Sequence, residues 1–326
     1  MKTFRTPLPD ATSLHSISLQ HKVFTLGSCF AETMGGYLQE YKINCLVNPF
    51  GTLYSPLAIH KVLRYSIFNE PVPNHTYITQ QDIHLNYDFH SALSDRSRPS
   101  LEKRITERLG TAHHFLRATD TLIITYGTAW VYERMDTGEP VANCHKKPST
   151  EFNKILLTQK KILESFDQVY QELMAINKGL RIIVTVSPVR HLKDTLELNS
   201  VSKSLLRVAC HTLQQSYVNV EYFPAYEIMM DDLRDYRFYK EDMIHPSADA
   251  EQYIWTHFYE RYGDAHVKAF IPKWKKIKES LNHRAFHPKG MAHQQFLKSL
   301  LAQLEALGNT ITVDAEIEHV KKQILH

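Results

Sequence analysis

Two short segments of the chain carry residues whose types and spacing suit nucleophilic chemistry. The first runs from Gly27 to Ala31, directly after an apolar run and directly before an amphipathic segment. This order predicts a strand, a tight turn and a helix, with the Ser28 hydroxyl at the helix N-terminus. Backbone N–H groups and the helix dipole favour developing negative charge there, which makes Ser28 a candidate nucleophile. The alternative is that Ser28 only caps the helix, as most serines at such a position do.

The second segment is the tetrapeptide from Asp242 to His245, beyond the last expected strand. An Asp-x-x-His spacing lets the carboxylate reach Nδ1 of the imidazole in the same turn, while Nε2 stays free to take a proton. Such a tetrapeptide arises by chance roughly once in a chain with this many Asp and His residues. Its position gives it weight, because the turn after the first strand and the segment after the last strand both lie at the carboxyl edge of a parallel sheet. We therefore expect Ser28, His245 and Asp242 to form a catalytic triad.

Five short apolar runs alternate with amphipathic segments over most of the chain, and they predict strands and helices respectively. The expected strands are Val23–Leu26, Ile43–Val47, Leu122–Thr125, Ile182–Val186 and Val220–Phe223. The expected helices are Ala31–Tyr41, Pro56–Phe68, Leu101–Leu116, Lys154–Ile176 and Val201–Gln215. This alternation favours a three-layer α/β fold, with a parallel sheet of about five strands covered on both faces.

Two stretches interrupt the alternation, and the C-terminal part departs from it. Residues 76–90 and 130–144 contain short β-prone runs, and Asp136-Thr137-Gly138 between two of these runs predicts a hairpin turn. From Tyr253 onward the apolar spacing is almost wholly helical, and we place the start of a C-terminal extension at about Ala265. The sequence thus predicts an α/β domain over residues 1–264 and a helical C-terminal extension over residues 265–326.

Length and composition restrict the class of protein. A chain of 326 residues with 43% hydrophobic content can build one large domain and an appendage. The formal net charge is only +3 and the basic residues are spread along the chain, which gives no footprint for nucleic acid. No apolar run is long enough to span a bilayer, and the N-terminus lacks the apolar stretch of a secretory signal. We therefore expect a cytoplasmic protein without a membrane partner. The sequence indicates no oligomeric state.

The four cysteines, Cys29, Cys45, Cys144 and Cys210, have neither the pairing of a zinc site nor the density of a disulfide scaffold, so we expect reduced thiols. Cys29 lies beside Ser28 at a helix N-terminus, a location that lowers the pKa of a thiol, but packing against the sheet is the simpler interpretation. Asn143, Cys144 and His145 gather polar groups that could line a substrate pocket. A metal site is disfavoured, because no second His or Cys pair stands at ligand spacing.

Three further residues are candidate substrate contacts. Arg190 and His191 follow the fourth expected strand, where they could hold a carboxylate or a sugar hydroxyl. A surface salt bridge or a loop hydrogen bond is an equally simple role for them. Trp130 could form an apolar wall near the nucleophile, although packing within a hairpin explains it equally well.

Several segments together resemble a known family. Gly27-Ser28-Cys29-Phe30-Ala31 spells the motif that gives the GSCFA-domain proteins their name, and this bacterial family is similar to the SGNH, or GDSL-like, hydrolases. Other segments that look like the family are Asn48–Thr52, Gly127–Trp130, Ser187–His191 and Asp235–Tyr239. The resemblance covers roughly residues 20–260. It implies a flavodoxin-like, three-layer sheet, with Ser28 as nucleophile, His245 as base and Asp242 as the acid that orients the base.

The resemblance also implies an oxyanion hole. In SGNH hydrolases three donors share it: the nucleophile's own N–H, a glycine N–H after the second strand and an Asn side chain after the third. Ser28 and Gly51 match the first two by position. The third departs, because the usual Gly-Xaa-Asn-Asp segment is Gly127–Trp130 here and contains no Asn, a loss that typically costs about 10²–10³ in turnover. The alternatives for the third donor are Thr128, the first choice by position, Asn48 and Asn143.

The expected activity is hydrolysis of an acyl ester through a covalent acyl-enzyme, without a cofactor or a metal. By analogy with the wider superfamily, the substrate is a small molecule or carbohydrate that carries a short acyl ester. Asn48 is a further candidate contact for it. Two other classes of function stay open: an acyltransferase that passes the same acyl group to an acceptor other than water, and a catalytically weak binding module on a hydrolase-like fold.

Overall fold

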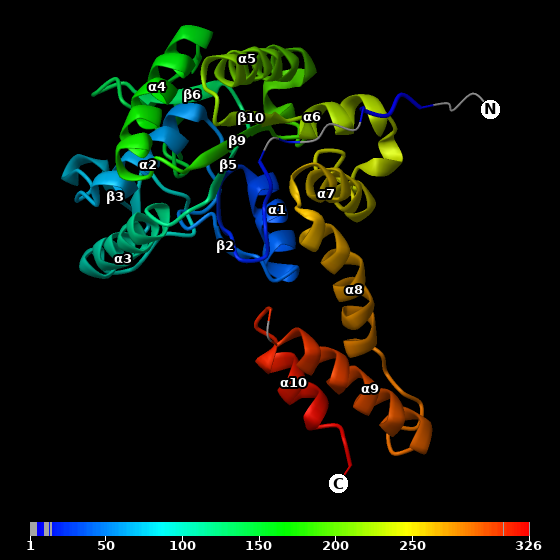
Figure 1. Ribbon diagram of the computed structural model, residues 1–326. Helices are drawn as coiled ribbons and strands as arrows, with labels where there is room; N and C mark the ends of the chain where they lie inside the picture. The colour runs from blue at the N-terminus through cyan, green and yellow to red at the C-terminus, as the bar shows by residue number, and fades with distance from the viewer. Residues whose placement is uncertain (1–4, 10–12, 14, 309, 326) are drawn as a thin grey trace.

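The computed structural model describes residues 5–9, 13, 15–308 and 310–325, and a five-stranded parallel sheet forms its centre (Figure 1). The strands are β1 (Lys22–Gly27), β2 (Asn44–Val47), β5 (Thr121–Tyr126), β9 (Arg181–Val186) and β10 (Val220–Phe223). Their order in the sheet is β10-β9-β5-β1-β2, and every neighbouring pair is parallel. This is the flavodoxin-like order, so the predicted fold class is confirmed.

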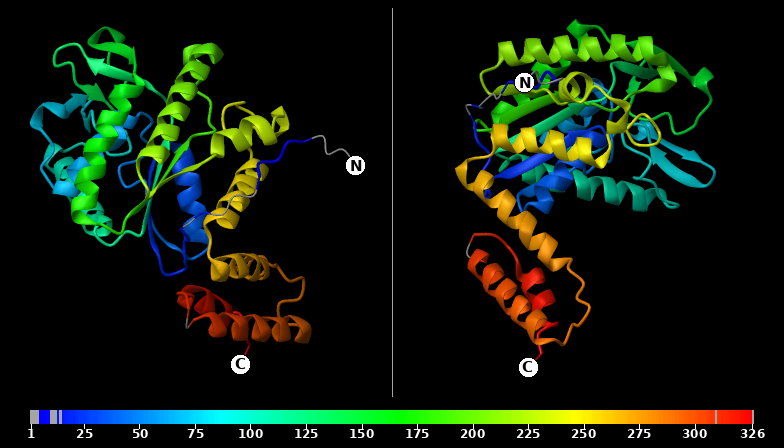
Figure 2. Two further views of the ribbon diagram at one scale, coloured as in Figure 1. Left: turned by 45° about the horizontal axis from the view of Figure 1, so that its top comes forward. Right: turned by 90° about the vertical axis from the view of Figure 1, so that its right-hand side faces the viewer.

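Alternate residues of each strand face opposite helical layers, because side chains along a strand point to opposite faces of a sheet. On β1, Phe24 and Leu26 belong to one buried cluster and Val23 to the other. The helices that pack on the first face are α2 (Pro56–Phe68), α3 (Arg98–Leu116), α4 (Gln159–Ile176) and α5 (Thr195–Ser216). Those on the second face are α1 (Cys29–Glu40) and α7 (Ala248–Tyr262). Figure 2 shows the sheet enclosed between these two groups of helices.

The strand order reverses between β1 and β5, which lie side by side in the sheet. In open α/β sheets, ligands bind outside the carboxyl ends of the strands at such a reversal point. The segments that leave β1 and β5 there begin with Ser28 and Gly127 respectively. The topology therefore brings the candidate nucleophile and the predicted third oxyanion donor to the same edge.

Two antiparallel additions account for the interruptions in the sequence pattern. Strands β3 (Tyr77–Gln80) and β4 (Ile83–Asn86) form a hairpin. Strands β6 (Trp130–Arg134), β7 (Pro140–Val141) and β8 (Phe152–Leu156) form a small sheet in the order β7-β6-β8. The predicted turn at Asp136-Thr137-Gly138 is confirmed, and Gly138 has the left-handed φ of +68° that favours glycine.

The helix expected over Lys154–Ile176 is wrong at its start. Residues 152–156 form strand β8, which pairs along its whole length with β6. Helix α4 begins only at Gln159, where the Thr158 hydroxyl accepts a hydrogen bond from the N–H of Lys161. The apolar positions of this stretch are compatible with a helix or with a strand. Residues 152–156 form a strand because they pair with β6, which lies earlier in the chain.

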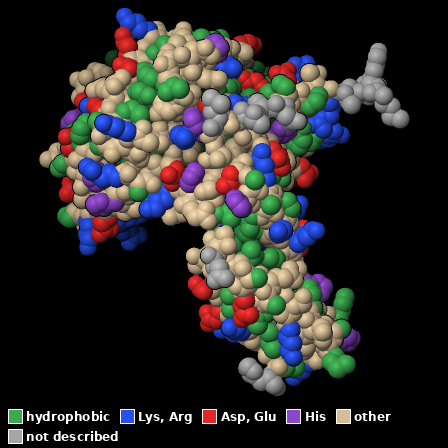
Figure 3. Space-filling view, viewed as in Figure 1, with side chains coloured by type: hydrophobic (Ala, Val, Ile, Leu, Met, Phe, Trp, Pro, Cys, Tyr) green, Lys and Arg blue, Asp and Glu red, His purple; other side chains and the backbone are tan. Residues whose placement is uncertain are grey.

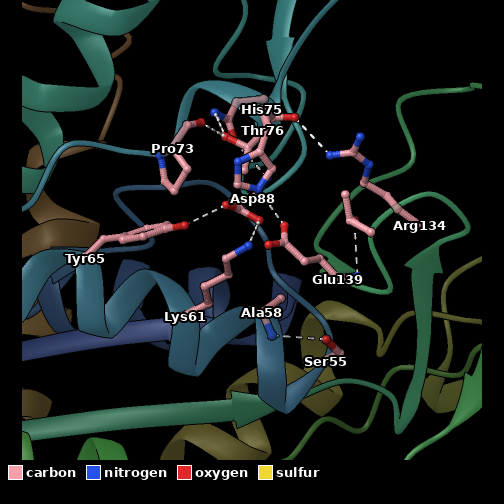
Figure 4. A network of polar contacts seen from close by, with 12 residues as sticks. Ser55, Ala58, Lys61, Tyr65, Pro73, His75, Thr76, Asp88, Arg134 and Glu139 are labelled. Carbon is pink, nitrogen blue, oxygen red and sulfur yellow. Dashed lines mark hydrogen bonds and ion pairs between the residues drawn. The ribbon is translucent and has the colours of Figure 1, made fainter.

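A buried carboxylate ties the β3–β4 hairpin region to helix α2 (Figure 4). Asp88 is almost fully buried and accepts hydrogen bonds from Lys61 Nζ at 2.7 Å and from the Tyr65 hydroxyl at 2.9 Å. Burial raises the pKa of Asp88, and the Lys61 ammonium is the strongest effect in the opposite direction. His75 and Glu139, which lie 2.8 Å apart, connect the same region to the β6–β7 hairpin. These contacts hold α2 and the two additions in one body beside the carboxyl edge of the sheet.

Short helical turns complete this body: α6 (Ala225–Glu227), the π-helix Ile228–Asp232, and the 3₁₀ turns Asn74–Thr76, Ser149–Glu151, Leu192–Asp194 and Tyr236–Phe238. Three further helices, α8 (Ala265–Leu281), α9 (Met291–Leu307) and α10 (Asp314–Lys321), form an arm that extends away from the sheet (Figures 1 and 2). Hydrophobic side chains gather along the part of the arm formed by α8 (Figure 3). The helices of the described ranges all lack the combination of length and apolar character that crossing a membrane requires.

The arm is attached to the end of helix α1. Trp274 of α8 is buried, and its Nε1–H donates to the carbonyl of Glu40 at 2.8 Å. Lys42 lies over the Trp274 ring at 5.1 Å and bonds Glu316 of α10 at 2.5 Å. The expected helical extension is present from Ala265 onward, while its status as a separate domain stays a prediction.

Candidate active site

The turn between β1 and α1 is a close contact between neighbouring strands. Gly27 has a φ of +139°, and a Cβ atom at this position would lie 2.1 Å from the carbonyl oxygen of Thr125. The Ser28 N–H donates to the same carbonyl at 3.1 Å. The Ser28 side chain is fully buried, and its Oγ accepts a hydrogen bond from the Phe30 N–H at 3.3 Å, which makes it the N-cap of α1. Cys29, the first helical residue, is half-buried.

Asn48, which follows β2, fixes this turn. The side chain is buried, its Oδ1 accepts from the Gly27 N–H at 3.0 Å, and its Nδ2 donates to the carbonyls of Gly27 and Ser28 at 3.4 Å each. Asn48 has a left-handed φ of +36°, a conformation that Asn tolerates better than most residues. Its amide therefore serves the backbone of the β1–α1 turn, and it does not line the clefts described below.

The Asp242–His245 segment forms the turn that its spacing predicts. His245 Nδ1 lies 2.7 Å from Asp242 Oδ2, while Asp242 Oδ1 accepts the backbone N–H groups of Ile244 at 2.9 Å and His245 at 3.0 Å. The His245 N–H is the strongest of these partners, followed by the His245 ring and the Ile244 N–H, and together they hold the pKa of Asp242 well below its usual range. The Nδ1–Asp242 contact leaves His245 Nε2 free for a proton from another group. The two side chains are 40% and 45% exposed.

A cleft of about 440 Å³, the main cleft, lies at the carboxyl edge of the sheet. Among the residues that line it are Cys29, Thr128, Trp130, Arg190, His191 and His245. A second cleft of about 290 Å³ adjoins it and is also lined by Cys29 and His245. Ser28 lines neither cleft, and no hydrogen bond between Ser28 and His245 occurs in the described residues. The structure thus pairs Asp242 with His245 and brings Cys29 to the same clefts, while the nucleophilic role of Ser28 stays a prediction.

All three predicted oxyanion donors already have hydrogen-bond partners within the fold. The Ser28 N–H donates to Thr125, and the Gly51 N–H donates to the carbonyl of Asn48 at 2.9 Å. The Thr128 hydroxyl lies 3.0 Å from Ser202 Oγ and accepts from the Trp130 N–H at 3.1 Å. Only Thr128 of these three lines the main cleft. The predicted oxyanion hole therefore requires these groups to exchange an existing partner for the substrate.

One wall of the main cleft combines cations and aromatic rings. The Arg190 guanidinium lies over the ring of Tyr239 at 4.0 Å, and no carboxylate of the described residues forms an ion pair with it. Lys154 lies over the ring of Trp130 at 5.0 Å and forms an ion pair with Asp194. Trp130 Nε1 donates to the carbonyl of Leu198 at 3.3 Å. The role of Arg190 in holding an anionic or hydroxylated ligand stays a prediction.

His191 lines the main cleft in its neutral form. Burial lowers the pKa of His191 to about 4, and the Lys203 ammonium adds to this effect. The ring contacts the Tyr54 ring edge to face at 5.5 Å between centroids. Its Nε2 is buried, and no described residue forms a hydrogen bond with it. The His191 ring therefore lines the cleft through atoms other than Nε2.

Asn143 and His145 do not reach the clefts. His145 is buried, its Nε2 lies 2.7 Å from the carbonyl of Asn86, and its backbone N–H donates to Asn143 Oδ1 at 2.8 Å. Both belong to a turn, with a left-handed φ of +50° at His145, that packs between the β3–β4 hairpin and the β6–β8 sheet. Only Val141 and Ala142 from this segment line the main cleft. The structure therefore does not bring these two expected substrate contacts to the site.

Lys203 is a buried residue near the site, and it is not among the residues that the sequence motifs predict. It lies on α5, and its Nζ donates to the carbonyl of Gly127 at 2.8 Å and to that of Ser187 at 2.7 Å. These two hydrogen bonds link the ends of β5 and β9. Burial lowers the pKa of Lys203 to about 7. The sequence does hold a signal, because Lys203 lies three and seven residues before the buried Leu206 and Cys210, on the apolar face of the helix.

Within the described residues, no three His, Cys, Asp or Glu side chains gather in a way that could hold a metal ion. Comparison with curated proteins finds none that matches the chain. A solved structure of a carbohydrate esterase family 3 from Talaromyces cellulolyticus is similar over 79% of this chain and 99% of its own, with 10% sequence identity and a TM-score of 0.36. Residues 22–258 match the GSCFA family, and residues 274–326 match the C-terminal domain of GSCFA domain proteins. The first match spans the sheet, both clefts and the Asp242–His245 turn, and the chain therefore belongs to the GSCFA family.

Proposed function

We propose that the main cleft catalyses the hydrolysis of acyl esters, with His245 as general base and Asp242 as the residue that orients it. The observation that carries this proposal is the 2.7 Å contact between His245 Nδ1 and Asp242 Oδ2 at the edge of a cleft beside the β1–α1 turn. A carboxylate on Nδ1 holds one tautomer and stabilises the imidazolium that forms when Nε2 takes a proton. The base is thus prepared for a nucleophile in that turn, and the sequence predicts Ser28 for this role.

A short acyl ester on a carbohydrate is the substrate class that we propose. The main cleft supports it by size and lining, since about 440 Å³ accommodates a small ligand. Tyr54, Trp130 and Tyr132 supply aromatic surface, and Arg190 and His191 supply hydrogen-bond donors and acceptors. Aromatic rings beside a few directional polar groups suit a sugar, which has both apolar faces and hydroxyls.

The test is the turnover of p-nitrophenyl acetate by the parent protein and by His245→Ala. We expect the variant to lose turnover by several orders of magnitude, since the base of such a triad accounts for most of the rate. His211→Ala is the matched control, because His211 is an exposed histidine of α5 outside both clefts. Circular dichroism shows whether each variant is folded. Equal turnover of His245→Ala and the parent contradicts the proposal.

One observation favours a second candidate, a binding module with weak turnover. The three predicted oxyanion donors, Ser28, Gly51 and Thr128, each have a partner within the fold. The binding module is supported if the folded parent protein binds a sugar ester in calorimetry but does not cleave it. Adding acceptor alcohols to the same esterase assay distinguishes an acyltransferase, because transfer then yields a new ester in place of the free acid.

A further inference from the structure

Two neighbouring side chains of the β1–α1 turn differ in what they face. Cys29 lines both clefts together with His245, and its side chain is half-buried. Ser28 is fully buried and lines neither. A nucleophile has to contact both the substrate and the base. Of these two residues, only Cys29 lines the same clefts as His245.

The hydrogen bonds of the turn also distinguish Ser28 from Cys29. Ser28 uses its Oγ as acceptor for the Phe30 N–H and its own N–H as donor to Thr125. Cys29 occupies the first position of α1, where a backbone N–H has no partner within the helix. No carbonyl or other side chain of the described residues accepts from the Cys29 N–H. The nucleophile's own N–H commonly stabilises the oxyanion in acyl transfer, and the turn leaves that donor available on Cys29 only.

Attack by Cys29 requires that its thiol lose a proton. Burial raises the pKa of the Cys29 thiol, so a base has to take the proton. The N–H groups of Phe30 and Cys29 and the Lys203 ammonium lower the pKa of the thiol, while the Glu32 carboxylate raises it further. His245 is the base that lines the same two clefts.

We infer that Cys29 is the nucleophile of the proposed acyl transfer and that Ser28 caps α1. This inference rests on the proposed function. Cys29 Sγ attacks the ester carbonyl while its proton passes to His245 Nε2, so an S–C bond forms. The C–O bond of the ester breaks, and the leaving alcohol takes the proton from His245. Water then attacks the thioester, giving its proton to His245 as the C–S bond breaks, and the proton returns to the sulfur as the acid leaves.

The experiment compares Cys29→Ala and Ser28→Gly with the parent protein on p-nitrophenyl acetate. Glycine caps a helix almost as well as serine but has no hydroxyl, which keeps α1 intact. We expect Cys29→Ala to lose at least about 10³-fold in kcat/KM and Ser28→Gly to keep turnover within about 10-fold. Mass spectrometry after a short reaction locates the acetyl group, and a thioester is released by neutral hydroxylamine. Cys144, which is also half-buried, measures the background acetylation of a thiol.

An acetyl group on Cys29 that forms faster than on Cys144, and that depends on His245, supports the inference. An acetyl group on Ser28, or full turnover of folded Cys29→Ala, overturns it and leaves the proposed esterase with Ser28 as nucleophile. Absence of turnover that depends on His245, with neither residue acetylated, overturns the proposed function and the inference together.

Discussion

His245 Nδ1 lies 2.7 Å from Asp242 Oδ2, and Oδ1 of the same carboxylate accepts two backbone N–H groups of its own turn. The carboxylate is therefore held by the backbone whether or not the imidazole is present. We predict that Asp242→Asn lowers kcat on an activated ester less than His245→Ala does, and that the two losses differ by at least about 10-fold. The reason is that the base contributes more than the residue that orients it. Asp249→Asn, an exposed carboxylate in the first turn of α7, is the control. A loss in Asp242→Asn as large as that in His245→Ala contradicts this prediction.

Thr128 stays the first choice for the third oxyanion donor, since it lines the main cleft and Asn143 does not. We predict that Thr128→Val lowers kcat by about 10²-fold or more with little change in KM, the pattern of an interaction made mainly in the transition state. Asn143→Ala should keep the kcat of the parent. Steady-state kinetics on one activated ester, with a check of folding, measures both. If Thr128→Val keeps full kcat, its hydroxyl serves only Ser202 and the Trp130 N–H.

Asn48 should contribute to stability through the β1–α1 turn. We predict that Asn48→Gly lowers the free energy of unfolding by about 1–3 kcal/mol, because the buried Gly27 N–H loses its acceptor. Asn69→Gly is a matched control: Asn69 also has a left-handed φ, +51°, at the end of α2, and glycine suits that position. Urea unfolding measures both variants. Equal stability of Asn48→Gly and the parent would mean that water replaces the amide.

Lys203 should make stability depend on pH. Burial lowers the pKa of Lys203 from its ordinary value of 10.5 to about 7 in the folded protein. Between these values the unfolded chain binds the proton and the folded protein has released it, so the contribution of Lys203 to stability rises with pH across this window and is constant below it. We predict that the stability of the parent relative to Lys203→Met increases from pH 7 to pH 9.5, by at most about 1.4 kcal/mol per pH unit.

Urea unfolding of the parent and of Lys203→Met at pH 6, 8 and 9.5 measures this difference. Lys160→Met is the control, because Lys160 is an exposed lysine of α4 whose pairing partner is one helical turn away. The difference between parent and Lys160→Met should stay flat over the same range. Parallel curves for the parent and Lys203→Met would show that the buried amine keeps its proton.

Arg190 should select anionic substrates. Its guanidinium lies over Tyr239 at the main cleft, without a carboxylate partner in the described part of the chain. We predict that Arg190→Met raises KM by about 10-fold or more for an ester that carries a carboxylate, such as a succinate monoester, because a hydrogen-bonded ion pair is lost. The KM for neutral p-nitrophenyl acetate should change little, and Arg190→Lys should recover part of the effect. An equal change for both esters would assign Arg190 to the packing of Tyr239.

The sequence by itself determined the five sheet strands, because a strand buried on both faces is a continuous apolar run bounded by turn residues. It also determined the Asp242–His245 contact, since a carboxylate and an imidazole three residues apart meet within one turn. The hairpin at Gly138 followed from turn residues alone. These features depend on neighbours only a few residues away along the chain.

The tertiary structure decided what depends on distant residues. Residues 152–156 form a strand because they pair with β6. Asn143 and His145 lie away from the site because their turn packs against the β3–β4 hairpin. The choice between Ser28 and Cys29 is of the same kind. Successive residues of a helix point about 100° apart, so which of two neighbours faces a cleft is set by how α1 lies on the sheet and by the Thr125 carbonyl that holds its first turn.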